Sequence, residues 1–158
     1  MKRTLIAAAL VCAVHAGTAA AEVLGGLVVG VADGDTLTVL DAGKVRHQVR
    51  LGEIDAPEKG QPFGQRSKQS LSDLCFQRQA NVLVQDRDRY GRIVGRVNCD
   101  GVDANAEQVR SGMAWVYDRY AADKKLYVIQ LSARQNQIGL WADAAPVQPW
   151  EWRKAKRN

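Results

Sequence analysis

The chain reads VLGGLVVGV over residues 23–31, TLTVL over 36–40 and VRHQVRL over 45–51, and these three segments decide its fold. All three are rich in β-branched residues, and the second and third alternate between apolar and polar positions, which predicts strands. Glycines interrupt the first segment, so we expect a bulge or a tight bend there. Asp33-Gly34-Asp35 and Asp41-Ala42-Gly43 are turn signals between the segments. The sequence therefore predicts a three-stranded antiparallel meander.

The segments that follow extend this pattern into a known class of barrel. Three strands, a helix, two more strands and then further helices is the element order of an OB-fold, a five-stranded barrel that often binds oligonucleotides. We therefore predict an α+β chain with about three helices. The expected helices are 65–76, 105–110 and 121–137, the last of them being the final helix, and the expected strands are 81–85 and 93–97, with 114–117 extended.

The first 21 residues have the pattern of a secretory signal peptide. Lys2 and Arg3 precede an apolar stretch from Thr4 to Val14, and Ala19-Ala20-Ala21 is a small-residue cleavage site. The apolar stretch is too short to cross a membrane. We expect a protein that is secreted or periplasmic, with no membrane attachment after cleavage; the alternative is an N-terminal core helix. The mature chain would contain a domain over 22–145 and a basic, Trp-containing tail over 146–158.

Loss of the signal peptide changes the charge and the cysteine count. Removing Lys2 and Arg3 lowers the formal net charge from +5 to +3, a mild positive balance that is compatible with a polyanionic partner. His47 is then the single histidine, which excludes a mechanism with two. Cys75 and Cys99 remain, and an even count in an exported chain favours a disulfide over two free thiols.

Four acidic residues lie near the ends of the predicted meander: Asp33, Asp35, Asp55 and Glu58. Neighbouring antiparallel strands bring such ends together, and carboxylate oxygens suit a hard cation such as Ca²⁺. The sequence has no Cys/His cluster of the kind that binds zinc. Each acidic residue alone could equally belong to an ordinary turn or a solvated loop.

Two arginines accompany these carboxylates. Arg50 lies on the polar face of the third strand, and Arg92 follows the turn Arg89-Tyr90-Gly91. Arginine binds phosphate through two parallel hydrogen bonds and stays charged. A cation and two arginines around one phosphate would stabilise the charge that develops during hydrolysis, with Glu58 as the base that deprotonates water.

The same residues carry a resemblance to a known family. Residues 33–37 (DGDTL) with 50–58 (RLGEIDAPE), and then 88–95 (DRYGRIVG), resemble the two signatures of the thermonuclease (staphylococcal nuclease-like) family in residue type and spacing. The resemblance extends from about Val28 to Trp141. It implies an exported, calcium-dependent nuclease that hydrolyses DNA and RNA with little sequence specificity and leaves 3′ phosphates. Single strands would be preferred. We expect a monomer, since nothing in the sequence requires more than one copy.

The resemblance also assigns roles to individual residues. Asp35, Asp55 and the backbone carbonyl of Ala56 would bind calcium, with Asp33 close behind them. Glu58 would be the general base, and Arg50 and Arg92 would hold the phosphate. The expected substrate contacts are Arg89, Tyr90 and a second tyrosine, for which Tyr117 and Tyr120 are both candidates.

Two rival interpretations keep the fold and change the function. A non-catalytic OB-fold could bind nucleic acid without cutting it, or an exported interaction module could hold a structural calcium. The tail from Trp150 to Arg157 places aromatic residues beside cations, a pattern that also binds nucleic acid. We expect instead that its tryptophans pack on the domain and that its charges are solvated.

Overall fold

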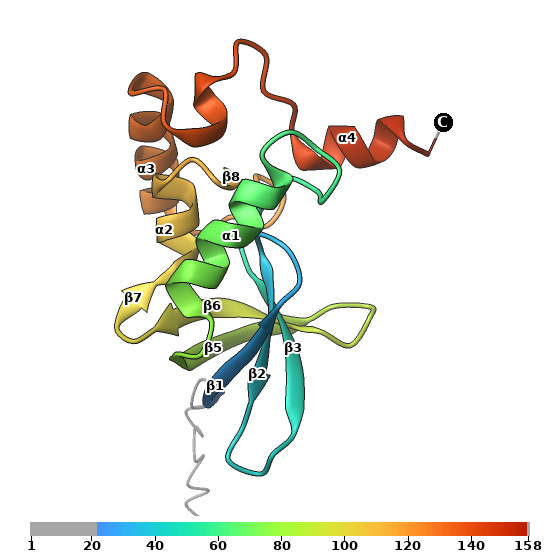
Figure 1. The fold of residues 1–158 in the computed structure, drawn as a ribbon, viewed down its shortest axis with the longest axis vertical. Helices are drawn as coiled ribbons and strands as arrows, with labels where there is room; N and C mark the ends of the chain where they lie inside the picture. Colours follow the sequence, from blue (N-terminus) through green and yellow to red (C-terminus); the bar gives the residue numbers. More distant parts are fainter. Residues whose placement is uncertain (1–21, 158) are drawn as a thin grey trace, which may run out of the picture.

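The computed structural model describes residues 22–157 and confirms the three-stranded meander. β1 (Val23–Val31) pairs antiparallel with β2 (Thr36–Leu40), and β2 pairs antiparallel with β3 (Arg46–Leu51). The β1–β2 register shifts between Val28 and Gly30, so the bulge expected from the glycines is present. In Figure 1 the β2–β3 hairpin extends from one end of the molecule.

Two further strands close the sheet into a barrel. β5 (Gln79–Arg87) pairs antiparallel with β1 and with β6 (Ile93–Cys99), and β6 pairs parallel with β3. The ring β1-β2-β3-β6-β5 is therefore complete, which is the five-stranded OB-fold barrel that the sequence predicts. Its interior is aliphatic and fully excluded from water, with Val28, Leu37, Val39, Val49, Leu51, Val82 and Val97 among its members.

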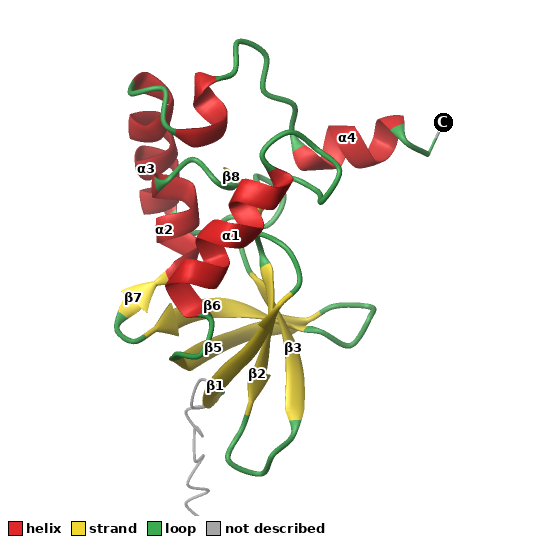
Figure 2. Cartoon of the chain, viewed as in Figure 1, coloured by secondary structure: helices red, strands yellow, loops and turns green. Residues whose placement is uncertain are grey.

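The three expected helices are present and lie over one end of the barrel, as Figure 2 shows. They are α1 (Gly64–Cys75), α2 (Ala104–Arg110) and α3 (Lys124–Gln135). α3 begins three residues later than expected because the Asp123 side chain caps it, accepting a hydrogen bond from the Lys125 N–H. Three two-residue strands complete the set: β4 (Ile54–Asp55) pairs with β8 (Trp115–Val116), and β7 (Val102–Asp103) extends the edge at β6.

The tail contains a further helix, so the prediction that 121–137 is the last one is wrong. A 3₁₀ turn, η1 (Gly139–Ala142), is followed by α4 (Pro149–Ala155). Pro149 is suited to the first turn of a helix because its fixed φ fits there and its missing N–H would have had no partner. α4 lies at the end of the molecule opposite the β2–β3 hairpin (Figure 1).

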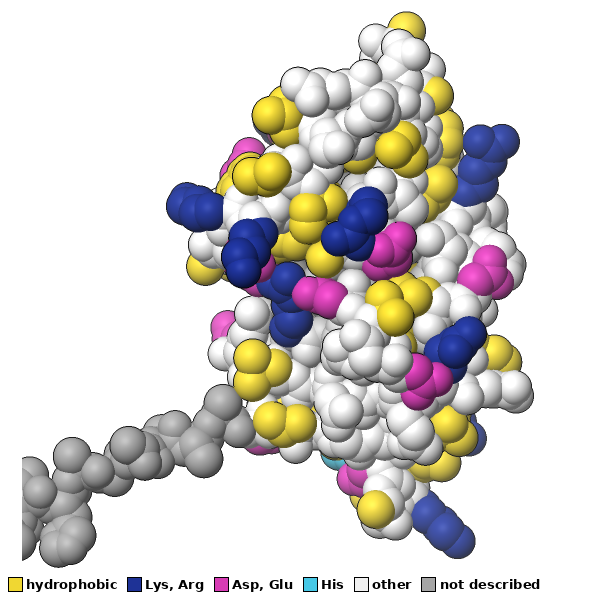
Figure 3. All heavy atoms as spheres, turned by 90° about the vertical axis from the view of Figure 1, so that its left-hand side faces the viewer, with side chains coloured by type: hydrophobic (Ala, Val, Ile, Leu, Met, Phe, Trp, Pro, Cys, Tyr) yellow, Lys and Arg dark blue, Asp and Glu magenta, His cyan; other side chains and the backbone are white. Residues whose placement is uncertain are grey.

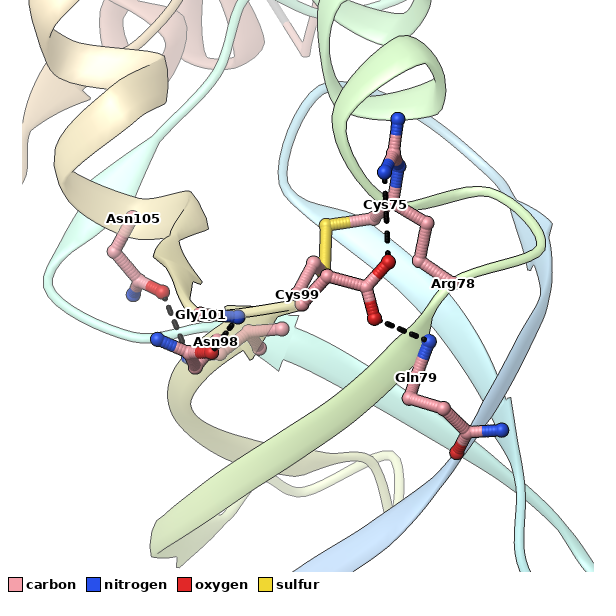
Figure 4. Close-up of a disulfide and its surroundings, with 9 residues drawn as sticks. Cys75, Arg78, Gln79, Asn98, Cys99, Gly101 and Asn105 are labelled. Carbon is pink, nitrogen blue, oxygen red and sulfur yellow. Dashed lines mark hydrogen bonds and ion pairs between the residues drawn. A yellow bond between two sulfur atoms is a disulfide. The ribbon is translucent and has the colours of Figure 1, made fainter.

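The predicted disulfide joins the end of α1 to the end of β6 (Figure 4). The Cα atoms of Cys75 and Cys99 are 5.4 Å apart, and both residues are buried in the core. Beside the bridge, the Gly101 N–H donates a hydrogen bond to Asn98 Oδ1 at 2.8 Å, which fixes the turn after β6. The covalent link therefore ties the helical layer to the barrel wall.

The surface is mixed in charge on the side that carries α3. Figure 3 shows Lys and Arg side chains interspersed there with acidic and hydrophobic ones. Among residues 22–157 no helix is long and apolar enough to cross a membrane. The predicted signal peptide lies outside the described residues. His47 is half-buried, and its Nε2 lies 2.8 Å from Asp41 Oδ2, so it fastens the β2–β3 hairpin.

Candidate active site

The first acidic element of the site is the Asp33-Gly34-Asp35 turn between β1 and β2. The Asp35 N–H donates to Asp33 Oδ1 at 3.0 Å, which closes the turn on itself. Buried Gln108 on α2 donates from Nε2 to the Gly34 carbonyl at 2.7 Å. The turn also packs closely on α1, since a Cβ on Gly34 would lie 1.8 Å from Ser67 Oγ. Two helices therefore fix the position of the Asp35 carboxylate.

The second acidic element is β4, which carries Asp55. Its side chain is 1% exposed, and Arg50 on β3 lies between the two aspartates. Arg50 Nη2 donates to Asp55 Oδ1 at 3.1 Å and reaches Asp35 Oδ2 at 3.4 Å. The Ala56 N–H donates to the same Asp35 oxygen at 3.0 Å. The prediction that strand ends bring Asp35 and Asp55 together is thus confirmed, with Arg50 as the bridge.

Burial and mutual repulsion perturb the acidic groups. Desolvation, and then the charge of Asp35, raise the pKa of Asp33 to about 6. Desolvation also raises the pKa of Asp55, with Asp35 adding to the shift and the nearby guanidinium groups opposing it. Burial disfavours the charge on Arg50, but Asp35 and Asp55 outweigh it and raise the pKa of the guanidinium. The site therefore has a local excess of negative charge that favours cations.

Glu58 lies on the loop between β4 and α1, and that loop is tightly held. The Glu58 N–H donates to Gln61 Oε1 at 3.1 Å, and the Gln61 N–H donates back to the Glu58 carbonyl at 2.8 Å. Gln61 Nε2 donates in turn to the Val147 carbonyl at 2.7 Å, which links the loop to the tail. The Glu58 side chain remains 41% exposed, so its carboxylate faces solvent while its backbone is fixed.

Arg153 on α4 is the site residue that sequence reasoning missed. Its Nη2 donates to Asp55 Oδ2 at 2.6 Å, and its Nη1 donates to Asp55 Oδ1 at 3.1 Å and to Glu58 Oε1 at 2.7 Å. Hydrogen bonding to Asp55 and then to Glu58 raises the pKa of the Arg153 guanidinium, despite its partial burial. The expectation that the tail charges are solvated is therefore wrong for this residue. A signal for α4 was present in Pro149 and the Lys/Arg residues that follow, but nothing local indicated the contact.

The β5–β6 turn carries Arg92, Arg89 and Tyr90. Arg92 Nε donates to Asp88 Oδ2 at 2.7 Å, so its ion-pair partner among residues 22–157 lies in its own turn rather than in the Asp35–Asp55 cluster. The parallel register places Val94 beside Arg50, so the turn that contains Arg92 lies next to β3 in the barrel. Tyr90 is 70% exposed, and the guanidinium groups of Arg89 and Arg92 lie 4.8 Å and 5.7 Å from its ring centroid.

The two candidate tyrosines near β8 differ in environment. The Tyr117 ring stacks on Trp150 of α4, with centroids 5.0 Å apart. Tyr120 packs edge-on against Tyr117 at 5.1 Å but is itself 60% exposed. The tail tryptophans thus pack on the domain, as expected, and leave Tyr120 as the freer of the two rings.

The oxygen atoms at this site are of the type that binds a hard cation. Asp35 and Asp55 provide two adjacent, buried carboxylates whose negative charges repel one another. No group of three Asp, Glu, His or Cys side chains within the described residues is arranged to hold a metal. A cation would therefore take its remaining ligands from backbone carbonyls and water, which is ordinary for Ca²⁺.

The barrel and this cluster of carboxylates and arginines define an OB-fold protein with its site at the strand ends around β3 and β4. Residues 48–143 match the family model described as staphylococcal nuclease homologue, and the chain belongs to that family. A protein named uncharacterized endonuclease from Escherichia coli is 48% identical over 132 residues, covering 83% of this chain and 86% of its own. Another protein of that name from Haemophilus influenzae is 45% identical over 130 residues, covering 82% of this chain and 73% of its own. A protein named micrococcal nuclease from Shigella flexneri is 40% identical over 144 residues, covering 84% and 82%.

Proposed function

We propose that this chain, a nuclease by its family, is an exported, calcium-dependent hydrolase of DNA and RNA phosphodiester bonds. The observation that carries the proposal is the bridge that Arg50 makes between Asp35 and Asp55. A purely structural calcium site has no use for a guanidinium between its two carboxylates. A phosphodiester site needs the carboxylates to hold a cation and the guanidinium beside them, because the phosphate must touch the cation and the arginine together.

Each residue then has a distinct task. Asp35, Asp55 and the Ala56 carbonyl would hold Ca²⁺, which when bound supplies positive charge to the phosphate and orients water. Glu58, on its fixed and exposed loop, would accept the proton of the attacking water. Arg50 and Arg92 would bind the phosphate oxygens as charge develops on them. Expulsion of the 5′ oxygen would leave a 3′ phosphate on the product.

Substrate recognition would use backbone charge and unstacked bases. Tyr90 and Arg89 are exposed on the β5–β6 turn, and Tyr120 is exposed beside β8. Aromatic rings stack on bases of any sequence, so single strands would be preferred and sequence would matter little. We infer that Tyr120, rather than the stacked Tyr117, makes the second aromatic contact.

Export and a monomeric state belong to the same proposal. The signal-peptide pattern over residues 1–21 supports export, and the Cys75–Cys99 disulfide is of a kind that persists in oxidising compartments. The five-stranded barrel is closed within one chain, so the fold needs no second copy to complete it.

The decisive experiment incubates residues 22–158 with single-stranded DNA, with Ca²⁺ or with a chelator, beside a Glu58→Gln variant. Cleavage that requires Ca²⁺ and falls by about 10²-fold or more in the variant would support both the enzyme and its base. Binding without cleavage in any divalent cation would instead support the alternative function, a non-catalytic OB-fold that binds nucleic acid.

A further inference from the structure

Arg153 occupies both oxygen atoms of Asp55, one of the residues that would hold the cation, and it comes from a helix outside the residues 48–143 that match the family. We propose that Arg153 is a built-in competitor of the cation: its guanidinium covers Asp55 and Glu58 until a divalent cation displaces it. The inference rests on the proposed calcium-dependent function and adds a regulatory contact to the same site.

The hydrogen-bond geometry places the cation and Arg153 in competition for the same carboxylate. Both Asp55 oxygens accept hydrogen bonds from Arg153, at 2.6 Å and 3.1 Å, and Oδ1 also accepts one from Arg50 at 3.1 Å. Ca²⁺ sits about 2.3–2.6 Å from its ligand oxygens. Arg50 reaches only Oδ1 of Asp55, whereas Arg153 engages both oxygens, so a cation at Oδ2 would share that oxygen with an Arg153 nitrogen and be repelled by its charge. The cation and Arg153 therefore compete for Asp55.

Charge balance favours exchange rather than loss of the arginine's charge. Arginine keeps its charge at ordinary pH, so the guanidinium does not leave the carboxylates by losing a proton. A divalent cation brings twice the charge of Arg153 to the same oxygens. A cation can therefore displace the guanidinium from Asp55.

The same contact covers the proposed base. Arg153 Nη1 donates to Glu58 Oε1 at 2.7 Å while it also bonds Asp55, so one side chain bridges the cation ligand and the base. With Arg153 in place, Glu58 Oε1 is paired with a positive charge, which makes the carboxylate a weaker base, although its Oε2 is not bonded to Arg153. A single group therefore acts on both the cation ligand and the base.

α4 can release this side chain without leaving the domain. Trp150 stacks on Tyr117 and lies 6.1 Å from Trp115 between ring centroids, which anchors the first turn of the helix. Arg153 lies one turn later, and its side chain is 38% exposed, so solvent is directly accessible to the released guanidinium. Rotation of one side chain is sufficient for the exchange.

The test measures Ca²⁺ binding by calorimetry on residues 22–158, without substrate. The variants are Arg153→Gln and, as a matched control, Lys154→Gln, whose residue lies next to it on α4 and is exposed, with Glu151 as its partner. If Arg153 covers the site at least nine-tenths of the time, its removal should tighten Ca²⁺ binding about tenfold or more. Lys154→Gln should bind Ca²⁺ as the wild type does.

The other outcomes are distinguishable. Equal Ca²⁺ affinity in wild type and Arg153→Gln would overturn the competition and leave the calcium-dependent nuclease intact. Weaker binding in Arg153→Gln would also overturn it, since Arg153 would then organise the carboxylates for the cation. Absence of Ca²⁺ binding in all three proteins would overturn the competition together with the proposed calcium dependence. Should Arg153→Gln fail to fold, Arg153→Lys keeps the charge but loses the paired bonds, and tighter binding than wild type is again expected.

Discussion

The Tyr117 and Trp150 rings lie nearly parallel, with planes 11° apart and centroids separated by 5.0 Å. This stack joins the residue that follows β8 to α4 and sets where the rest of α4 lies over the site. Because Trp150 is three residues before Arg153, the stack determines whether the guanidinium can reach Asp55. The position of a residue in the site thus depends on an aromatic contact outside it.

Replacement of Trp150 by alanine tests that dependence. Trp150→Ala removes the stack, and we expect a loss of about 2 kcal/mol in the free energy of unfolding, below the 3–5 kcal/mol of a fully buried tryptophan because Trp150 is half-buried. Arg153 should lose its fixed approach, so Ca²⁺ should bind more tightly than in the wild type. Chemical denaturation and calorimetry measure the two effects.

The control is Glu151→Ala, an exposed change on the same helix. Unaltered Ca²⁺ affinity in Trp150→Ala would show that α4 does not need the stack to place Arg153 against Asp55.

Arg50 offers a prediction about catalysis. Arg50→Lys keeps the charge between Asp35 and Asp55 but loses the planar fork that can bind phosphate with two hydrogen bonds. We expect kcat on single-stranded DNA to fall by about 10²-fold, as for loss of one preorganised donor in a transition state. Arg46→Lys, on the exposed start of the same strand, should be neutral. Steady-state kinetics on a short oligonucleotide would measure both, and an unchanged kcat in Arg50→Lys would remove Arg50 from the phosphate site.

The disulfide makes a prediction about stability. The free energy of unfolding of the Cys75→Ala, Cys99→Ala double variant should be about 3 kcal/mol lower than that of the wild type, because the bridge restricts the unfolded chain over a separation of 24 residues. For a domain of this size that loss lowers Tm by about 10 °C. Thermal unfolding of the oxidised protein, the reduced protein and the double variant measures it. The reduced protein should resemble the double variant, whereas equal Tm values in all three would mean that the bridge does not stabilise the fold.

The barrel could be predicted from the sequence because the alternation of apolar and polar residues that specifies each strand lies within a short segment of the chain. Alternation over residues 36–40 and 45–51 places Val39, Val49 and Leu51 inside, and all three are fully buried. The pairing of Asp35 with Asp55 also followed, since adjacent antiparallel strands must bring their ends together. The late start of α3 did not follow, because the capping power of the Asp123 side chain competes with helix propensity in the preceding residues.

The contact of Arg153 could not be predicted, for a physical reason. It joins residues separated by 98 positions, and it depends on the position of α4 after the 3₁₀ turn and the loop that precedes the helix. That position is set by packing of Trp150 on Tyr117 and Trp115, which a periodic sequence pattern does not encode. Long-range contacts of a terminal segment become visible only when the three-dimensional packing is known.

The last prediction concerns Gly34, the centre of the acidic turn. A Cβ at this position would lie 1.8 Å from Ser67 Oγ and 2.8 Å from the Ala56 Cβ. Moving the Ser67 side chain would be costly in free energy, because it is buried on α1 and its hydroxyl donates to the Met113 carbonyl at 2.6 Å. In Gly34→Ala the turn must therefore move, and Asp35 must move with it.

We expect Gly34→Ala to cost about 1–3 kcal/mol of stability, as overpacking of a dense interior does, and to weaken Ca²⁺ binding as well. Gly43→Ala is the matched control, since it lies on an exposed hairpin turn where the nearest atom to an added Cβ is Asp41 Oδ1 at 3.3 Å. Chemical denaturation and calorimetry distinguish the two effects. A Gly34→Ala protein with lowered stability but wild-type Ca²⁺ affinity would mean that Asp35 keeps its place when the turn shifts, and that the close packing of the turn on α1 stabilises the fold without positioning the cation ligand.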